Sequence, residues 1–502
     1  MKKTLTILWI IIIAGTIFIA IHFTKPTNIE EESTKIIENI KISRDTKDNT
    51  KTTDVVIEKT PAVILENSNK TFSEYLNLGD KHLSDNYLDN AIENYQGAYY
   101  LNNNSEEAIT KLANAYLLNN QAEEAKQFLI NANIELPESE EIIFYLVKSY
   151  INIHDFTAAQ NLIWQLNENY EDNLKYKFYK ALLLTIGKDY EGSKKLFSEI
   201  ISTETESYNE FIENSQKFLD AYEDFSYYTE AEDIFLDLKL TKILTEIEEY
   251  HASIPLLYAI LKDKNDYRDA WIVLGYVYLN TQQTLEAIDA FEQAEIINPN
   301  KDETLFFLGL SHYANDDVDN AIHYIEKAEK AGFEDQEQID LRLGELYLIK
   351  ENYEKSAQKY DNLLSSNQKN IKIYIRTVWL YIEKLNKADK ALKIAEDAIE
   401  YHPEEAMSYN LLAWVYIAKN DTEKAKENLE IALEMNPYFD AANFNFGILY
   451  EKQGLALLAK EYYKNAYILG DGNSISQMAA SNFNKLTEKE AQKYYQTNIS
   501  QP

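Results

Sequence analysis

The stretch that decides the fold, residues 268–301, has the sequence RDAWIVLGYVYLNTQQTLEAIDAFEQAEIINPNK. Its first half places Trp271, Leu274 and Tyr278 at i, i+3 and i+7, which puts one apolar stripe on a helix. Pro299 near its end cannot continue a helix and starts a loop. The pattern therefore predicts a first helix, a turn and a second helix that ends before Pro299.

Small residues stand where the two predicted helices would approach each other. Gly275 in the first helix and Ala287 in the second leave room for close contact, and Phe291 and Ala294 place a large and a small residue on the inner stripe. One such hairpin cannot bury its own apolar face, so it needs neighbours of the same kind.

The spacing of eight residues resembles the tetratricopeptide repeat, a 34-residue helix–turn–helix unit whose signature opens with W-x2-L-G-x2-Y. The matching residues are Trp271, Leu274, Gly275, Tyr278, Ala287, Phe291, Ala294 and Pro299. The resemblance implies a solenoid of stacked helix pairs and a protein that binds other proteins.

The pattern recurs along most of the chain. The further units are 72–105, 106–139, 140–173, 174–207, 234–267, 302–336, 337–371, 372–405, 406–439 and 440–473. We expect one extra residue around Ala331-Gly332 and a second one in 337–371. Residues 208–233 break the period and predict an incomplete or distorted unit, which either bends the solenoid as a partner site or is mere decay of the repeat.

The predicted fold class is all-α, a right-handed superhelical α–α solenoid of tetratricopeptide helix pairs with one N-terminal transmembrane helix. The predicted segments are a transmembrane anchor (1–23), a flexible linker (24–70), a first repeat array (71–207), an irregular helical segment (208–233), a second, more regular array (234–473), and a capping helix and tail (474–502).

The N-terminal segment predicts a membrane anchor. Residues 4–23 contain no Asp, Glu, Lys or Arg, and a helix of that length spans roughly 30 Å, the thickness of the bilayer core. Lys2 and Lys3 place the N-terminus in the cytoplasm, so we expect a single-pass cell-membrane protein with its C-terminal array outside the cytoplasm. The alternative is a cleaved signal peptide, although no small-x-small cleavage site is evident.

The linker predicted for 24–70 offers little apolar surface. It contains Glu30-Glu31-Glu32 and the polar run RDTKDNTKTT, residues 44–53. Such a composition does not offset the entropy lost on ordering, roughly 1–2 kcal/mol per residue, so we expect a flexible tether.

The charge balance argues against nucleic acid as a partner. The formal net charge is −34, and sequence-independent binding of nucleic acid needs Lys and Arg to displace counterions. The four arginines are Arg44, Arg268, Arg342 and Arg376. Without cysteine, the chain has no disulfide, no thiolate nucleophile and no zinc ribbon.

No arrangement of residues predicts catalysis, a metal or another cofactor. The seven histidines are scattered, without an H-E-x-x-H motif or an i, i+4 pair. A P-loop and a G-x-S-x-G motif are also missing from the sequence. We therefore expect a protein that is not an enzyme and takes no small-molecule substrate.

In the repeat family the first helices line a concave face that commonly receives a peptide. The side chains expected on this face are apolar or aromatic here, which favours a groove for an apolar peptide or an amphipathic helix. The candidate groove residues are Ile272, Tyr276, Phe306, Leu310, Tyr313, Asn410, Trp414 and Phe444. Asn410 is the candidate for a hydrogen bond to ligand backbone. The alternative is that these side chains pack against the adjacent unit.

Two functional hypotheses follow from the resemblance. The first is a membrane-anchored scaffold or adaptor that mediates protein–protein interactions in envelope assembly or secretion. The second is a non-catalytic regulatory subunit that controls an envelope-biosynthesis enzyme or protease. A third possibility, a catalytic protein, finds no unassigned stretch long enough for a second domain.

Overall fold

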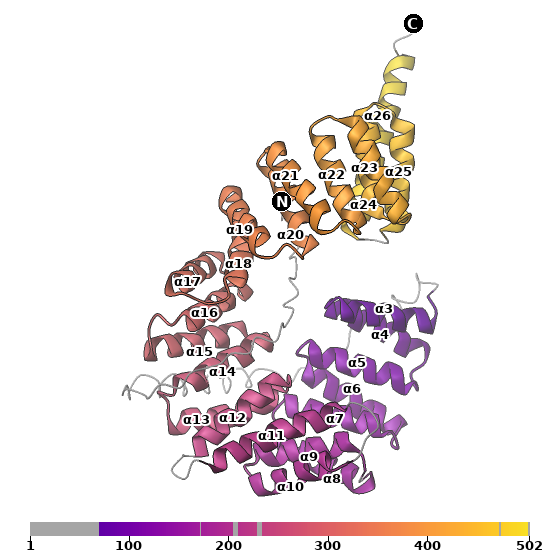
Figure 1. The fold of residues 1–502 in the computed structure, drawn as a ribbon. Coiled ribbons are helices and arrows are strands. Elements are labelled where there is room, and N and C mark those ends of the chain that lie inside the picture. The colour runs from indigo at the N-terminus through magenta and orange to yellow at the C-terminus, as the bar shows by residue number, and fades with distance from the viewer. Residues whose placement is uncertain (1–69, 171, 204–208, 228–232, 471–472, 500–502) are drawn as a thin grey trace. The chain divides into compact units, whose positions relative to one another are not determined.

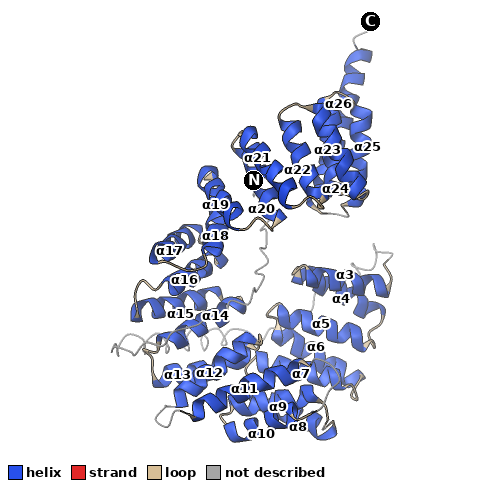
Figure 2. Cartoon of the chain, viewed as in Figure 1, coloured by secondary structure: helices blue, strands red, loops and turns tan. Residues whose placement is uncertain are grey.

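The computed structural model describes residues 70–170, 172–203, 209–227, 233–470 and 473–499. Every regular element in these ranges is a helix, and none of them is a strand (Figure 2). The described chain is an all-α helical-repeat solenoid, as the sequence predicted. It forms two compact units, one ending at Asn315 and one beginning at Asp316. Figure 1 labels the helices of both units along the chain.

Within each compact unit the helices follow one another as antiparallel pairs, with α11 as a single helix between pairs and the boundary between the two units falling between α16 and α17. Their bounds are α3(Phe72–Ser84), α4(Leu88–Leu101), α5(Glu106–Leu118), α6(Ala122–Glu135), α7(Glu140–Asn152), α8(Phe156–Asn169), α9(Leu174–Ile186), α10(Tyr190–Ile201), α11(Glu210–Ser226), α12(Asp233–Glu246), α13(Tyr250–Asp263), α14(Arg268–Asn280), α15(Thr284–Ile297), α16(Asp302–Ala314), α17(Val318–Ala331), α18(Gln336–Ile349), α19(Tyr353–Ser366), α20(Ile371–Trp379), η1(Leu380–Lys384), α21(Ala388–Tyr401), α22(Ala406–Ala418), α23(Thr422–Met435), α24(Asp440–Lys452), α25(Ala456–Leu469) and α26(Ser474–Ile499).

The turn inside each pair contains one residue in the left-handed backbone region, which lets the chain reverse within three residues. These residues are Asn86, Asn120, His154, Lys188, Glu248, Gln282, Asp316, Glu351, Asn386, Asn420 and Gly454. Successive members lie 34 residues apart from Asn86 to Lys188, from Glu248 to Asp316 and from Asn386 to Gly454. The backbone thus carries the period that the side-chain pattern predicted.

The period breaks where the sequence placed an irregular segment. Sixty residues separate the left-handed residues Lys188 and Glu248. The additional length holds α11, a helix of 17 residues that packs against α10 and α12. The segment boundaries proposed from repeat regularity stay predictions, because compactness divides the chain at a different place, after Asn315.

Two extra residues lie inside first helices. The loop before α18 keeps the usual spacing, since the N-cap residues Lys301 and Asp335 are 34 apart, and α18 itself has 14 residues where α16 has 13. The expectation of an insertion around Ala331-Gly332 was therefore wrong. The second extra residue is absorbed by η1, a π-helical turn in which the Leu385 N–H donates to the Leu380 carbonyl. It lies beyond residues 337–371, where the second slip was expected, because the extra residue is taken up inside the next first helix and not in the preceding unit.

The small residues of the pattern sit beneath aromatic rings of the paired helix. A Cβ atom on Gly275 would lie 2.8 Å from ring carbons of Phe291, and one on Gly447 would lie 2.5 Å from ring carbons of Tyr463. Both rings are fully buried. The glycines thus allow α14 to approach α15 and α24 to approach α25 closely enough to bury a ring between them.

The predicted membrane span, residues 4–23, and the predicted linker lie outside the described residues, apart from Lys70. Within the part of the chain that the structure describes, no helix is long and apolar enough to cross a bilayer. At the other end, α26 packs against α25 and α24, where the sequence predicted a capping helix.

Candidate interaction surfaces

In the first compact unit, the candidate groove residues differ in their exposure. Ile272 and Phe306 are 3% and 2% exposed, so both side chains are buried in the described structure. Tyr276, Leu310 and Tyr313 are half-buried, on the first helices α14 and α16. The binding role of all five stays a prediction, and the half-buried residues alone present side-chain surface without rearrangement.

Tyr276 is held between aromatic neighbours. Its ring meets Tyr250 of α13 edge-on at a centroid distance of 6.3 Å, and Phe307 of α16 at 5.9 Å. Edge-to-face pairs of this kind favour one ring orientation. Tyr276 therefore presents its remaining surface in a fixed position between two neighbouring first helices.

In the second compact unit, Asn410 uses its hydrogen-bonding groups within the array. It is 3% exposed, and its Oδ1 accepts a bond of 2.9 Å from Nδ2 of Asn445 on the next first helix, α24. Its own Nδ2 lies 3.7 Å from Sδ of Met407. A ligand backbone would have to compete with these contacts, so binding by Asn410 remains a prediction.

Trp414 and Phe444 are the half-buried aromatic residues that the pattern predicted on α22 and α24. The Phe444 ring packs against the fully buried Tyr463 of α25 at a centroid distance of 5.7 Å. Trp414 packs beside the buried cluster that includes Leu411 and Val415. Each side chain thus has one side fixed in the core and the other open to a partner.

The second unit also holds a buried ion cluster that the sequence did not reveal. Arg342 and Glu345 of α18 are 8% and 6% exposed, and Nη1 of Arg342 donates to Oε2 of Glu345 at 3.2 Å. Nε of Arg342 is buried without a hydrogen-bond partner. Burial raises the pKa of Glu345, whereas Arg342 and Arg376 act to lower it. Two arginines therefore surround one buried carboxylate.

A looser ion cluster lies in the first unit. The Arg268 guanidinium is 3.8 Å from Asp269 and 3.8 Å from Glu303, on α14 and α16. Burial raises the pKa of Glu303 and lowers the pKa of Lys242 on α12. Three successive first helices, α12, α14 and α16, thus carry these partly buried charges. The i, i+3 spacing of Arg342 and Glu345 is visible in the sequence. The contacts of Arg268 with neighbouring repeats are not, because they join residues of different helices.

Tyrosine hydroxyls supply many of the donors that pair with the acidic side chains. Tyr95 donates to Asp80 at 2.7 Å, Tyr381 to Asp361 at 2.6 Å and Tyr463 to Glu451 at 2.9 Å. In each case burial, followed by the carboxylate, raises the pKa of the phenol. A neutral donor satisfies a carboxylate without an arginine, which suits a chain with few arginines.

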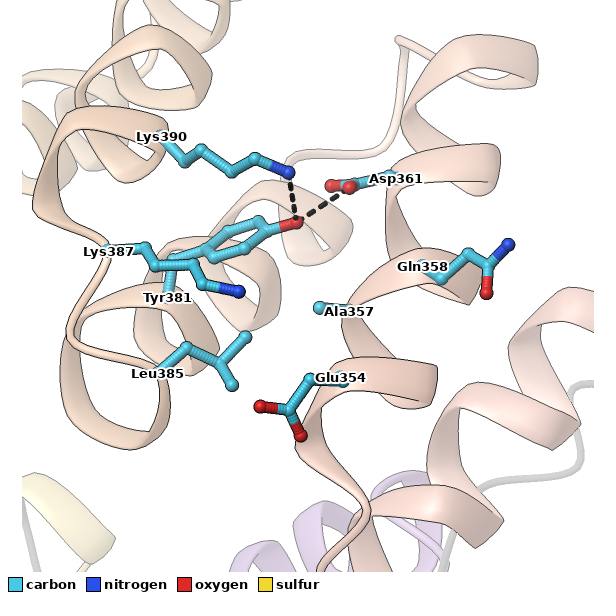
Figure 3. Close-up of a pocket in the computed structure, with 8 residues that line it drawn as sticks. All are labelled: Glu354, Ala357, Gln358, Asp361, Tyr381, Leu385, Lys387 and Lys390. Atoms are coloured by element: carbon cyan, nitrogen blue, oxygen red, sulfur yellow. Dashed lines mark hydrogen bonds between the residues drawn. The ribbon is translucent and has the colours of Figure 1, made fainter.

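One of these bonds borders a small cavity of about 200 Å³ beside the π-helical turn (Figure 3). It is lined by Glu354, Ala357, Gln358, Asp361, Tyr381, Leu385, Lys387 and Lys390. The Tyr381 hydroxyl lies between the Asp361 carboxylate and Nζ of Lys390, the latter at 3.5 Å. The charges of its lining are balanced, so the cavity favours neither anions nor cations. Among the described side chains, no group of three His, Cys, Asp or Glu could hold a metal ion.

The protein-family models that match this chain align with its repeats. Two family models, both described as tetratricopeptide repeat, match residues 269–301 and 406–439, and residues 308–370. The chain contains tetratricopeptide repeats. The three matched ranges fall on α14–α15, on α22–α23 and on most of α16–α19.

Among curated proteins, the chain is similar to the peroxisomal targeting signal receptor of Candida albicans, with 24% identity over 344 residues. That match covers 64% of this chain and 53% of the receptor, so the chain spans about half the length of this relative. A shorter match, 34% identical over 77 residues, is to the photosystem I assembly protein Ycf3 of Prochlorococcus marinus, covering 15% of this chain and 42% of that protein.

Among solved structures, the APC/C hetero-tetramer Cut9–Hcn1 matches with a TM-score of 0.31 and 12% identity, covering 83% of this chain and 96% of that one. Yeast Tom70 matches with a TM-score of 0.28 and 15% identity, covering 84% of this chain and 96% of that one.

Tetratricopeptide-repeat proteins are generally non-catalytic scaffolds. Proteins or peptides are therefore the class of partner that the matched repeats favour.

Proposed function

We propose that the chain is a right-handed tetratricopeptide solenoid, anchored in the cell membrane by residues 4–23, that assembles envelope or secretion machinery outside the cytoplasm. It binds a partner segment, an apolar peptide or an amphipathic helix, along its first helices. The observation that carries the binding proposal is the pair Trp414 and Phe444, two half-buried aromatic side chains on the consecutive first helices α22 and α24.

Half-buried aromatic residues suit the role of anchors. Their inner edges are already fixed by packing, so binding costs little side-chain entropy, while their outer faces offer apolar area. Anchors of this type often supply most of the binding energy of an interface. The other half-buried candidates, Tyr276, Leu310 and Tyr313, would play the same part in the first unit.

Charge adds a second element of recognition. The net charge of −34 favours the approach of partners with basic surfaces. The cluster of Arg342, Arg376 and Glu345 carries one surplus positive charge, so it favours an acidic side chain near α18 and α20. A mainly basic amphipathic segment with one acidic residue would satisfy both conditions.

We expect Trp414→Ala and Phe444→Ala each to reduce partner capture by about 10-fold or more, because each removes an anchoring ring. The measurement is cross-linking in intact cells, followed by mass spectrometry of the partners and comparison of their yields at equal amounts of chain. Leu457→Ala is the matched control, since Leu457 is 80% exposed on the second helix α25. Undiminished capture by both aromatic variants, with helicity intact, would rule out this surface.

The same experiment separates the two functional hypotheses. Assembly or secretion components among the captured proteins support the scaffold. A biosynthetic enzyme or protease, whose activity changes when the chain is removed, supports a regulatory subunit instead.

We expect the full-length chain with a C-terminal tag to fractionate with membranes at its full mass. It should resist extraction by high salt and dissolve in detergent, because a span of about 20 apolar residues partitions into the hydrocarbon core. Protease added to spheroplasts should digest the tag. A shortened product in the soluble fraction would instead indicate a cleaved signal peptide and would contradict the anchor.

A further inference from the structure

The first compact unit closes on itself through helices that are distant in sequence. Helices α7 and α9 both pack against α13. Nδ2 of Asn120, in the turn between α5 and α6, donates to the carbonyl of Thr281, in the turn between α14 and α15. Residues from the α5–α6 and α7–α8 turns thus meet α13 and the α14–α15 turn.

A charged contact supports this closure. The hydroxyl of Tyr179 on α9 donates to the carboxylate of Glu249, the residue that precedes α13. Nζ of Lys148 on α7 lies 3.9 Å from the same carboxylate. Glu249 therefore links α7, α9 and α13, and burial followed by this carboxylate raises the pKa of Tyr179.

Two imidazole rings form the centre of the closure. His154 in the α7–α8 turn and His251 on α13 have ring centroids 5.7 Å apart, and both side chains are half-buried. They border a cavity of about 560 Å³. Its remaining lining residues are Asn120, Asn152, Ile153 and Gln283, which contribute no charge.

We propose that this contact is a pH-operated clasp: protonation of His154 and His251 separates the α7–α8 turn from α13 and opens the first compact unit. The clasp is the set of contacts His154–His251, Asn120–Thr281 and Glu249 with Tyr179 and Lys148.

The physical reason is that two positive charges on rings whose centroids are 5.7 Å apart repel each other, and that burial leaves them poorly solvated. Burial, and after it the charge of His154, lowers the pKa of His251 to about 4. The elements packed against α13 carry many titratable or charged groups: Glu140, Glu141, Tyr145, Lys148 and Tyr150 on α7, Lys175, Tyr176, Lys177, Tyr179 and Lys180 on α9, Asp233, Asp237, Lys239, Lys242 and Glu246 on α12, Arg268, Asp269, Tyr276 and Tyr278 on α14, and Glu248 and Glu249 directly before α13. The shift of the His251 pKa comes from burial and from His154.

The sign of the pH effect follows from the lowered pKa. An open form whose His251 has its ordinary pKa of about 6.5 takes up a proton well before the closed form does. The closed form is therefore favoured above about pH 6.5, and its population relative to the open form falls as the pH falls towards 4. Between pH 7.5 and pH 5.0 the ratio of closed to open molecules should fall about 30-fold through His251 alone.

Opening would also change the packing of a residue in the predicted binding surface. Tyr250 directly precedes His251, and its ring packs against Tyr276. Movement of α13 would thus remove one of the neighbours that hold Tyr276 in place. The clasp itself does not depend on which partner the chain binds.

The absence of cysteine makes the test direct, because spin labels attach only at introduced sites. Leu118→Cys and Leu285→Cys suit this purpose, since the two side chains are 52% and 61% exposed at the ends of α5 and α15 that meet at the closure. Electron–electron distance measurements on the full chain at pH 7.5 and 5.0 should show one short, narrow distribution and then a longer, broader one.

The variant His154→Gln/His251→Gln should show the short distribution at both pH values, and His323→Gln, an exposed histidine on α17, should behave as the unmodified chain. Circular dichroism at both pH values verifies that helices persist. If the double variant loses helicity, His251→Gln alone serves, with a smaller pH response expected. The clasp would be overturned if the distance distribution of the unmodified chain did not change with pH. It would also be overturned if the distribution changed equally in a folded glutamine variant.

Discussion

Replacing Phe306 by alanine should lower the free energy of unfolding of the first compact unit by about 3–5 kcal/mol. The side chain is 2% exposed on α16, and its ring packs edge-on against Phe307 at a centroid distance of 5.8 Å. Its removal deletes buried apolar surface and leaves a cavity that the neighbouring helices can fill only in part. Hydrogen exchange of α15 and α16 measures the loss locally, which matters because a long repeat array need not unfold in one step.

Phe235→Ala is the matched control for this prediction. Phe235 lies on the first helix α12 of the same unit but is 42% exposed, so its truncation should cost about 1 kcal/mol or less. Equal protection factors in the Phe306 variant and the unmodified chain would show that Phe306 is not a core residue. The side chain would then be available to a ligand, as the sequence pattern suggested.

Replacing Gly447 by alanine should destabilise the second compact unit by about 1–3 kcal/mol, although alanine is the better helix former. The added Cβ would lie 2.5 Å from Cδ1 and Cε1 of Tyr463, closer than the atoms can pack. The ring cannot easily yield, because Tyr463 is fully buried and its hydroxyl donates to Glu451 at 2.9 Å. The free energy of unfolding, followed by denaturant and by hydrogen exchange across α24 and α25, measures the effect.

Gly344→Ala provides the comparison at the equivalent repeat position in the same unit. Its Cβ would lie 3.2 Å from Cε2 of Tyr360, a distance that a shift of a few tenths of an ångström relieves. The gain in helix propensity, about 1 kcal/mol, should offset most of the strain, so this variant should stay near the stability of the unmodified chain. A Gly447 variant as stable as the Gly344 variant would contradict the close helix approach.

The repeat architecture could be predicted from the sequence because it depends on local pattern. The spacing of Trp271, Gly275 and Phe291 reports which side chains face a neighbouring helix, and the left-handed residues of the turns recur at the same interval of 34. The interruption between Lys188 and Glu248 was visible for the same reason, since it is a break in that interval.

The exposure of the candidate groove residues could not be predicted in this way. Ile272, Phe306 and Asn410 hold repeat positions that usually face a ligand, yet each is at most 3% exposed. Whether such a side chain is covered depends on the size and contacts of residues in the adjacent repeats. The partner of Asn410, for instance, is Asn445, which lies 35 residues further along the chain.

Contacts between elements distant in sequence could not be predicted from the repeat pattern either. His154 and His251 are 97 residues apart, and nothing in the repeat spacing indicates that their turns meet. The π-helical turn Leu380–Lys384 appeared in the sequence as a slip of one residue, but its position in a first helix required the backbone. The buried cluster of Arg342 and Glu345 was likewise hidden among the many charged residues of an acidic chain.

The measurement that tests the central claim most directly is photo-cross-linking from position 414 in intact cells. A benzoyl-bearing phenylalanine analogue in place of Trp414 should form a cross-link to a discrete protein partner, and Phe444→Ala in the same chain should abolish that cross-link. The same analogue at Leu457, which is 80% exposed on a second helix, should give no such product. Cross-links of equal yield and identity from positions 414 and 457, or none from position 414, would contradict an account in which first helices bind the partner.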